Sequence, residues 1–178
     1  MNPLITAYLD NADRFSAVVT TGGDWGGASP CTEWNASDVL HHVIDSQRDF
    51  LATRGADLGP RPEGEPAEVW ERHLDAVRAV VADEAFATAE YDGHFGRTSI
   101  ADTLANFYGF DLAVHRWDLA RALGQDVAFD DTEMDRLEQS IAGFGDALYT
   151  NSVCAPALDV PPDAPRQTRV LGLLGRRA

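Results

Sequence analysis

Apolar residues recur every three or four positions through most of this chain, which is the spacing of helices with one buried side. The first such pattern covers 3–20, and Pro3 suits the first turn of a helix. The second begins at Asn35 or Ser37, either of which can cap a helix, and Gly55 can end it. These patterns predict two amphipathic helices, and the glycine-rich stretch between them predicts a loop.

The later patterns predict three more helices, over 66–81, 98–124 and 130–148. The glycine-containing stretch between the first two of these is predicted to be a turn. Prolines follow the last helix and predict an extended tail, in which 168–175 can add one or two helical turns. The sequence therefore predicts an all-α fold, a four-helix bundle with an additional C-terminal helix and an extended tail.

Composition narrows the class of protein. The 178 residues suit a single domain spanning 1–178, and a hydrophobic content of 44% is enough for a core. Fourteen basic and 29 acidic residues give a net charge of −15, which argues against binding nucleic acid or an anionic membrane. No apolar run reaches the roughly 20 residues of a membrane span, and no signal peptide precedes the first helix, so a cytoplasmic location is expected. The two cysteines, Cys31 and Cys154, are expected to be reduced and structural.

Two polar residues interrupt the apolar stripe of the longest predicted helix. The stripe starts with Ile100, Leu104 and Phe107 and continues through Asp111 and His115. Residues four apart on a helix project from the same face, so Asp111 and His115 can hold one ion together. A buried carboxylate without a partner costs several kcal/mol, so the pair needs compensation. Either the two pair with each other or with an arginine, or they bind a metal with a third ligand.

His42 is the candidate third ligand. On its predicted helix it falls on the stripe with Val39 and Phe50, whereas the neighbouring His41 lies about 100° away. Two imidazoles and one carboxylate leave a position for water or substrate, as in catalytic rather than structural metal sites. The predicted metal ligands are therefore His42, Asp111 and His115, while no residue is assigned a catalytic role.

Other residues whose side chains could bind ligands or take part in catalysis are expected to have structural roles. His73 is expected to be non-functional, near the edge of its helix's buried stripe, and His94 to be solvated in the turn. Trp34 is expected to pack and Asp118 to make a hydrogen bond between helices. Arg116 is expected at the surface or behind the ligands.

Three segments carry a resemblance to a known family. CTEWNASDVLHHV and DLAVHRWDLARALGQD resemble the two motif segments of the actinobacterial relatives of mycothiol-dependent maleylpyruvate isomerase, which have the DinB-like bundle. The tail, VPPDAPRQTRVLGLLGRRA, is similar to the closing region of the single-domain members. The resemblance implies a DinB-like fold and a divalent metal, commonly zinc with nickel or iron as alternatives, held by His42, Asp111 and His115.

The same resemblance implies a thiol partner, mycothiol, as cosubstrate of a small electrophile, and a homodimer is compatible with it. Two departures shape the expected reaction. The isomerase has Glu where this chain has Asp111, and it carries a C-terminal domain with residues important for turnover that these 178 residues do not contain. Thiol transfer or a related detoxification step is therefore expected in place of maleylpyruvate isomerisation.

Three functions remain open from the sequence. The first is a metal-dependent thiol S-transferase or related enzyme, since a metal can lower the pKa of a bound thiol or water. The second is a non-catalytic helical bundle whose polar residues form a hydrogen-bonded network or hold a structural ion. The third is a mononuclear non-haem iron enzyme, which also uses two histidines and one carboxylate.

Overall fold

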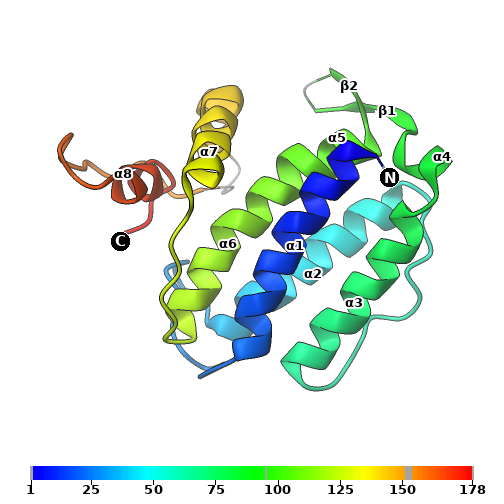
Figure 1. Cartoon of the computed structure of the whole chain (residues 1–178), viewed down its shortest axis with the longest axis horizontal. Helices are drawn as coiled ribbons and strands as arrows, with labels where there is room; N and C mark the ends of the chain where they lie inside the picture. Colours follow the sequence, from blue (N-terminus) through cyan, green and yellow to red (C-terminus); the bar gives the residue numbers. More distant parts are fainter. Residues whose placement is uncertain (1, 95, 151–153, 178) are drawn as a thin grey trace.

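The computed structural model describes residues 2–94, 96–150 and 154–177. Four long helical segments lie side by side, and the fourth is built from three consecutive pieces (Figure 1). They are α1 (Pro3–Thr21), α2 (Ala36–Thr53), α3 (Pro66–Val81) and the run of α5 (Ile100–Thr103), η1 (Leu104–Tyr108) and α6 (Gly109–Ala122). Helices α1 and α2 each contact both α3 and α6, which closes the group around one core. The all-α class and the four principal helices are thus confirmed.

Polar side chains cap the starts of α2 and α5, and the cap of α2 is Asn35, one of the two predicted residues. The Asn35 side chain accepts a hydrogen bond from the backbone N–H of Asp38, whose carboxylate in turn accepts from the Asn35 N–H. Ser99 caps α5 through the N–H of Asp102. Such caps satisfy backbone donors that a helix cannot pair internally, and each typically stabilises by about 1 kcal/mol. They also fix where each helix begins, and therefore which side chains face inward.

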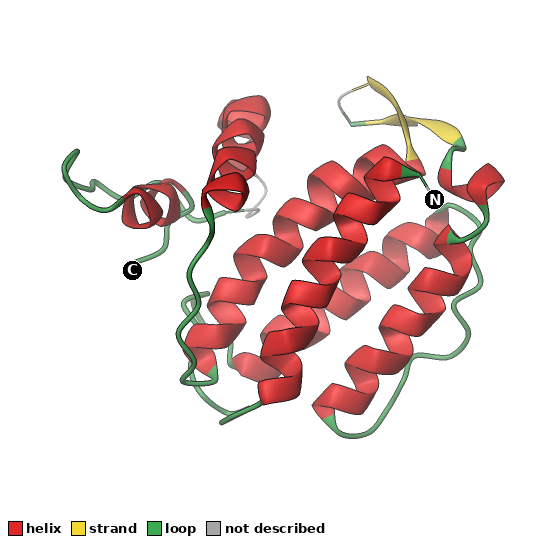
Figure 2. Cartoon of the chain, viewed as in Figure 1, coloured by secondary structure: helices red, strands yellow, loops and turns green. Residues whose placement is uncertain are grey.

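The stretch predicted as a turn between the third and fourth helices contains a short antiparallel hairpin. After the single turn α4 (Glu84–Ala87), strand β1 (Glu90–Gly93) pairs with β2 (Gly96–Ser99), with Tyr91 opposite Thr98 (Figure 2). Each strand has four residues, too few to show an alternating pattern in the sequence. The hairpin lies at one end of the bundle (Figure 2).

A second layer covers the outer side of α6. It consists of α7 (Asp131–Phe144), the 3₁₀ turn η2 (Gly145–Tyr149) and α8 (Arg166–Leu173) (Figure 1). The α8 helix confirms the predicted helical turns of the tail, whereas the helix predicted to run through Leu148 ends at Phe144 and continues as 3₁₀. These elements enclose a second apolar cluster against α6.

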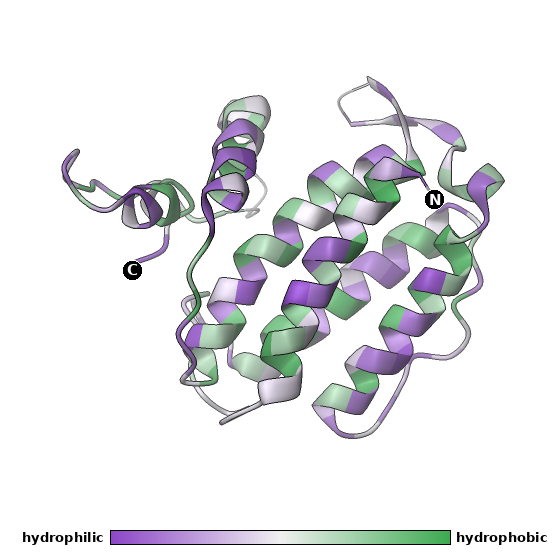
Figure 3. Cartoon of the chain, viewed as in Figure 1, coloured by the Kyte–Doolittle hydropathy of each residue, from purple (hydrophilic) through white to green (hydrophobic). Residues whose placement is uncertain are grey.

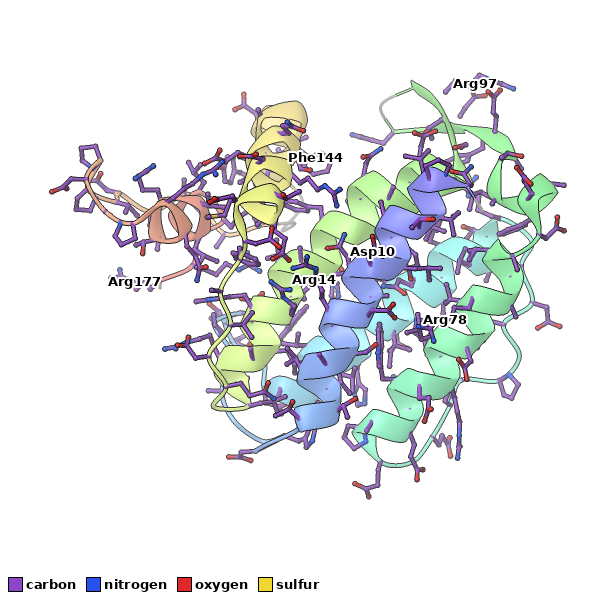
Figure 4. All side chains as sticks on the ribbon, viewed as in Figure 1. Asp10, Arg14, Arg78, Arg97, Phe144 and Arg177 are labelled. Atoms are coloured by element: carbon purple, nitrogen blue, oxygen red, sulfur yellow. The ribbon has the colours of Figure 1, made fainter. Side chains whose placement is uncertain are left out.

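Helix α6 is consequently buried on both sides. Nearly all its residues are inaccessible, and hydrophilic and hydrophobic positions are mixed along it (Figure 3). Arg116, expected at the surface or behind the ligands, is buried and pairs with Glu133 of α7 at 2.9 Å. Arg14 of α1 reaches the same Glu133 and also Asp130, each at 2.9 Å (Figure 4). Ion pairs thus join the second layer to the bundle.

The fourth long helix contains a π-helical turn, η1. A π turn adds one residue to the helical repeat, so the residues after it are rotated relative to a regular α-helix. The prediction that Phe107 lies on the buried stripe is wrong for this reason: its side chain is 39% exposed, while the neighbouring Tyr108 is buried.

Every described helix is too short or too polar to cross a membrane. This agrees with the absence of long apolar runs from the sequence.

Candidate metal centre

Helices α2 and α6 bring the three predicted ligands together. His42 projects from α2, and Asp111 and His115 project from successive turns of α6. The Nε2 atom of His115 lies 3.4 Å from Oδ1 of Asp111, and Nε2 of His42 lies 3.9 Å from the same oxygen. One ligand atom from each residue falls within 4.8 Å of the other two. This spacing fits a single metal ion bound by two imidazoles and a carboxylate.

Asp111 is the residue that most needs a cation. Its side chain is only 19% exposed, and among the described residues its Oδ2 atom has no hydrogen-bond partner. Burial alone raises the pKa of this carboxyl, but the charge and hydrogen bonding of His115, and then of His42, outweigh burial and hold the pKa below its ordinary value. Asp111 is therefore a carboxylate with one uncompensated oxygen, which a metal ion would satisfy.

A second carboxylate orients His115 from behind. The Nδ1 atom of His115 lies 3.0 Å from Oδ2 of Asp118, which is fully buried. Burial opposes ionisation of Asp118, but hydrogen bonds from His115 and Arg176 lower its pKa to about 2. With Nδ1 donating to Asp118, the Nε2 atom faces Asp111 with its lone pair available for a metal. Metal-binding histidines are commonly held in this way.

Protonation of His115 competes with metal binding. Burial lowers the pKa of this imidazole, but Asp111, followed by Asp118 and Cys31, raises it well above its ordinary value. The metal-free site therefore favours an imidazolium, and a metal ion would replace its proton.

Trp34 covers the two histidines. Its ring centroid lies 4.8 Å from that of His42 and 6.0 Å from that of His115. The residue before it, Glu33, has a φ of 69°, a left-handed conformation that non-glycine residues seldom adopt. The backbone N–H of Trp34 closes this turn by donating to the Cys31 carbonyl at 3.1 Å. Trp34 packs as predicted, but against the ligands themselves.

Cys31, His115 and Asp118 form a second group with metal-like spacing. Here a cation is already present, because Arg176 donates to Asp118 from Nη2 at 2.8 Å and to the Cys31 sulfur at 3.5 Å. The group is therefore a buried ion pair behind the metal centre. Sequence reasoning missed Cys31 and Arg176. The available signal was that Asp118, on a helix buried from both sides, needs a cation.

A cavity of about 710 Å³ opens beside the ligands. Asp111 and His115 form part of its wall, and Arg54, Arg97 and Asp102 are among its polar lining residues. The aromatic part of the wall is formed by Phe50, Tyr91, Phe107, Tyr108, Phe110 and Phe144. The volume is in the range of small-molecule sites, and a wall that combines aromatic rings with polar groups is typical of them.

The remaining histidines lie outside the metal centre. His41 is exposed, as its position on the helix predicted, and His94 is exposed on the hairpin, where it also lines the cavity. The edge position expected for His73 is wrong, because this residue is fully buried; its Nε2 lies 3.0 Å from the Gln47 side-chain oxygen. Ser46, one turn beyond His42, bonds to the Val43 carbonyl at 3.3 Å.

Similar proteins come from Mycobacterium tuberculosis. The uncharacterized proteins MT0763, from strain CDC 1551 / Oshkosh, and Rv0738, from strain H37Rv, are each 27% identical to this chain over 186 residues. The similarity covers 99% of this chain and 98% of each relative. No family model and no solved structure matches the chain.

Proposed function

We propose that His42, Asp111 and His115 hold one divalent metal ion, and that the protein is a metal-dependent thiol S-transferase or related detoxification enzyme with a DinB-like fold. The observation that carries this proposal is Asp111, a half-buried carboxylate between two imidazoles whose buried Oδ2 atom has no hydrogen-bond partner among the described residues. Ion pairing within the three residues leaves that oxygen uncompensated. A metal ion compensates it and uses all three side chains.

The ligand set supports a catalytic site over a structural one. Structural zinc usually has four protein ligands, whereas three leave a position for a reactant. Zinc is the expected metal, with nickel or iron as alternatives for the same donors. When bound, the metal supplies Lewis acidity that favours the thiolate form of a thiol, or hydroxide over water.

The chain's own residues account for the rest of the proposed site. Asp118 holds the His115 ring so that Nε2 faces the cavity side. Trp34 packs on both imidazoles and helps to hold their rings in place. The aromatic wall favours a small apolar electrophile, and the polar groups at the cavity edge can hydrogen-bond the hydroxyl and amide groups of a thiol cosubstrate such as mycothiol.

Elemental analysis of protein purified without an affinity tag tests the metal site. About one zinc or nickel per chain supports the proposal. Iron at the same stoichiometry favours a mononuclear non-haem iron enzyme. A metal-free protein that takes up none of these ions contradicts the proposal and leaves a hydrogen-bonded bundle.

A conjugation assay tests the reaction class. Mycothiol and 1-chloro-2,4-dinitrobenzene are suitable reactants, since the sulfur forms a bond to the ring carbon as chloride leaves and the thiol proton goes to solvent. The zinc-loaded protein should accelerate the reaction, and His41→Ala should match wild type because His41 is exposed. Equal rates for wild type and the His115→Ala variant would contradict the transferase assignment.

A further inference from the structure

The last described residues of the chain pack against the outer side of α6, which the second layer covers. Helix α8 ends at Leu173, and Gly175 turns the chain with a φ of 76°. A side chain at Gly175 would meet Ala155, whose Cβ would lie 2.7 Å away, so glycine is needed there. The Arg176 N–H then donates to the Leu171 carbonyl at 2.9 Å, which aims the Arg176 side chain back toward α6. This arginine is only 8% exposed.

The Arg176 guanidinium is held on every side. Its Nε donates to Oδ1 of Asp118 at 3.2 Å and its Nη2 to Oδ2 at 2.8 Å, a two-pronged pair. Its Nη1 donates to the Leu174 carbonyl at 2.7 Å and to the sulfur of Cys154 at 3.7 Å, and Nη2 also reaches the sulfur of Cys31 at 3.5 Å. Such a pair seldom stabilises more than packed apolar side chains would, so stability alone does not explain it.

One oxygen connects this arginine to the metal ligand. Oδ2 of Asp118 accepts from Arg176 and from Nδ1 of His115, at 2.8 and 3.0 Å, and the Cys31 thiol donates to it at 3.3 Å. If Arg176 were absent, Asp118 would be a buried carboxylate without its strongest partner, and it would turn toward water or bind a proton. Either change would release the His115 ring from its fixed orientation.

We propose that Arg176 is a positioning residue for the metal centre, acting through Asp118 on His115, and that docking of the C-terminal segment 154–177 is coupled to metal binding. This inference rests on the proposed metal site. The coupling is reciprocal: a docked segment raises metal affinity, and bound metal favours the docked segment.

Zinc affinity of matched arginine variants tests the first half of this coupling. Arg176→Gln should raise the dissociation constant for Zn²⁺ roughly tenfold to a hundredfold, the usual effect of losing a residue that orients a ligand. Arg177→Gln is the control, because Arg177 is the next residue, carries the same charge and is exposed at the chain end (Figure 4). It should stay within about twofold of wild type. Unchanged affinity in folded Arg176→Gln would overturn the inference.

A double variant keeps the test decisive if Arg176→Gln folds poorly. Asp118→Asn combined with Arg176→Gln removes both buried charges and keeps an oxygen that can accept from Nδ1 of His115. This protein should fold and recover most of the zinc affinity that the single variant loses. If the double variant folds but binds zinc as weakly as Arg176→Gln, the proposed route through Asp118 is wrong.

Alkylation of Cys154 tests the reciprocal half. This thiol is half-buried against Arg176 on the wall of the cavity, and burial raises its pKa, so it should react with iodoacetamide faster when the segment opens. Saturating zinc should slow its alkylation in wild type and in Arg177→Gln, but not in Arg176→Gln. Zinc binding to wild type without any slowing would overturn the coupling alone. No zinc binding to wild type would overturn the proposed metal site as well.

Discussion

His115 and His73 are both buried on bundle helices, yet their surroundings have opposite effects. His115 lies between the carboxylates of Asp111 and Asp118, which raise its pKa above the ordinary value despite burial. His73 faces the neutral Gln47, and burial, reinforced by the charge of Arg48, lowers its pKa to about 3. The surroundings of His115 favour its protonated form, whereas those of His73 disfavour it.

The difference teaches what makes a buried histidine a candidate ligand. The Gln47 oxygen that faces His73 also accepts from the Tyr8 hydroxyl at 2.7 Å, so this group is a neutral network within the core. His115 has a carboxylate on each ring nitrogen and borders a cavity. Burial is common to both, so the partner charges and the adjacent space are the informative features.

Replacing each histidine with alanine should give the largest measurable difference between the two environments. His115→Ala should lower zinc affinity at least about tenfold, because an incomplete set of ligands remains. His73→Ala should lower thermal stability through its cavity but leave zinc affinity unchanged. Isothermal titration with zinc and thermal melts in chelator measure both effects. Full metal retention in His115→Ala would remove this residue from the site, and His41→Ala should behave as wild type in both assays.

The Asp111→Asn variant should sharpen the role of the negative charge. It keeps the side-chain volume but removes the charge that offsets a divalent cation, so the zinc-induced shift in melting temperature should shrink. At a zinc concentration of roughly 100 times the dissociation constant, wild type should gain about 2.7 kcal/mol, and the variant much less at the same concentration. In chelator the substitution should lower stability, because it removes a charged partner of the buried His115 imidazolium. Equal zinc-induced shifts would mean that Asp111 is not a ligand.

The pH dependence of stability should differ in sign between the two histidines. His73 has a folded pKa of about 3 against an ordinary value of 6.5, so the unfolded chain binds its proton first. The contribution of His73 to the free energy of unfolding is fully present above pH 6.5. It is lost as the pH falls below that value, with a slope of up to about 1.4 kcal/mol per pH unit. His73→Gln should therefore flatten the acid side of a urea-denaturation profile.

The metal-free His115 should act in the opposite direction. The pKa of His115 is higher in the folded protein than in the unfolded chain. The contribution of His115 to the free energy of unfolding is therefore fully present below the unfolded pKa, and it is lost as the pH rises through the folded pKa. His115→Gln, studied in chelator, should remove stability on the acid side and change the alkaline side little. Identical pH profiles for the two variants would contradict the comparison.

Periodicity was sufficient for the main helices, and it selected three residues that lie close together, whose role as metal ligands stays a prediction. The stripes located the four main helices, and the choice of His42 over His41 followed from about 100° of helical phase. The helix predictions succeed because each depends on local spacing within one segment of the chain. The DinB-like family and the thiol cosubstrate stay predictions.

The residues behind the ligands could not be predicted in the same way. The single-stripe interpretation of α6 fails because α7 and α8 bury its outer side as well, which places Arg116 in the interior. Arg176 meets Asp118 across 58 residues of chain, and no periodic pattern records such a contact. The hairpin strands were also too short to leave a signal.

The π turn at Leu104–Tyr108 changes the direction in which the side chains of α6, including Asp111 and His115, project. Without its extra residue, every side chain after it would be rotated by about 100°, and Asp111 and His115 would turn away from His42. The same turn lets Ile100 and Leu104 fill the bundle core while the next two turns of the helix meet the cavity. Deleting a single residue such as Ala105 should therefore preserve helicity yet dismantle the metal centre, whereas substitutions at that position should leave the alignment of the two helices intact.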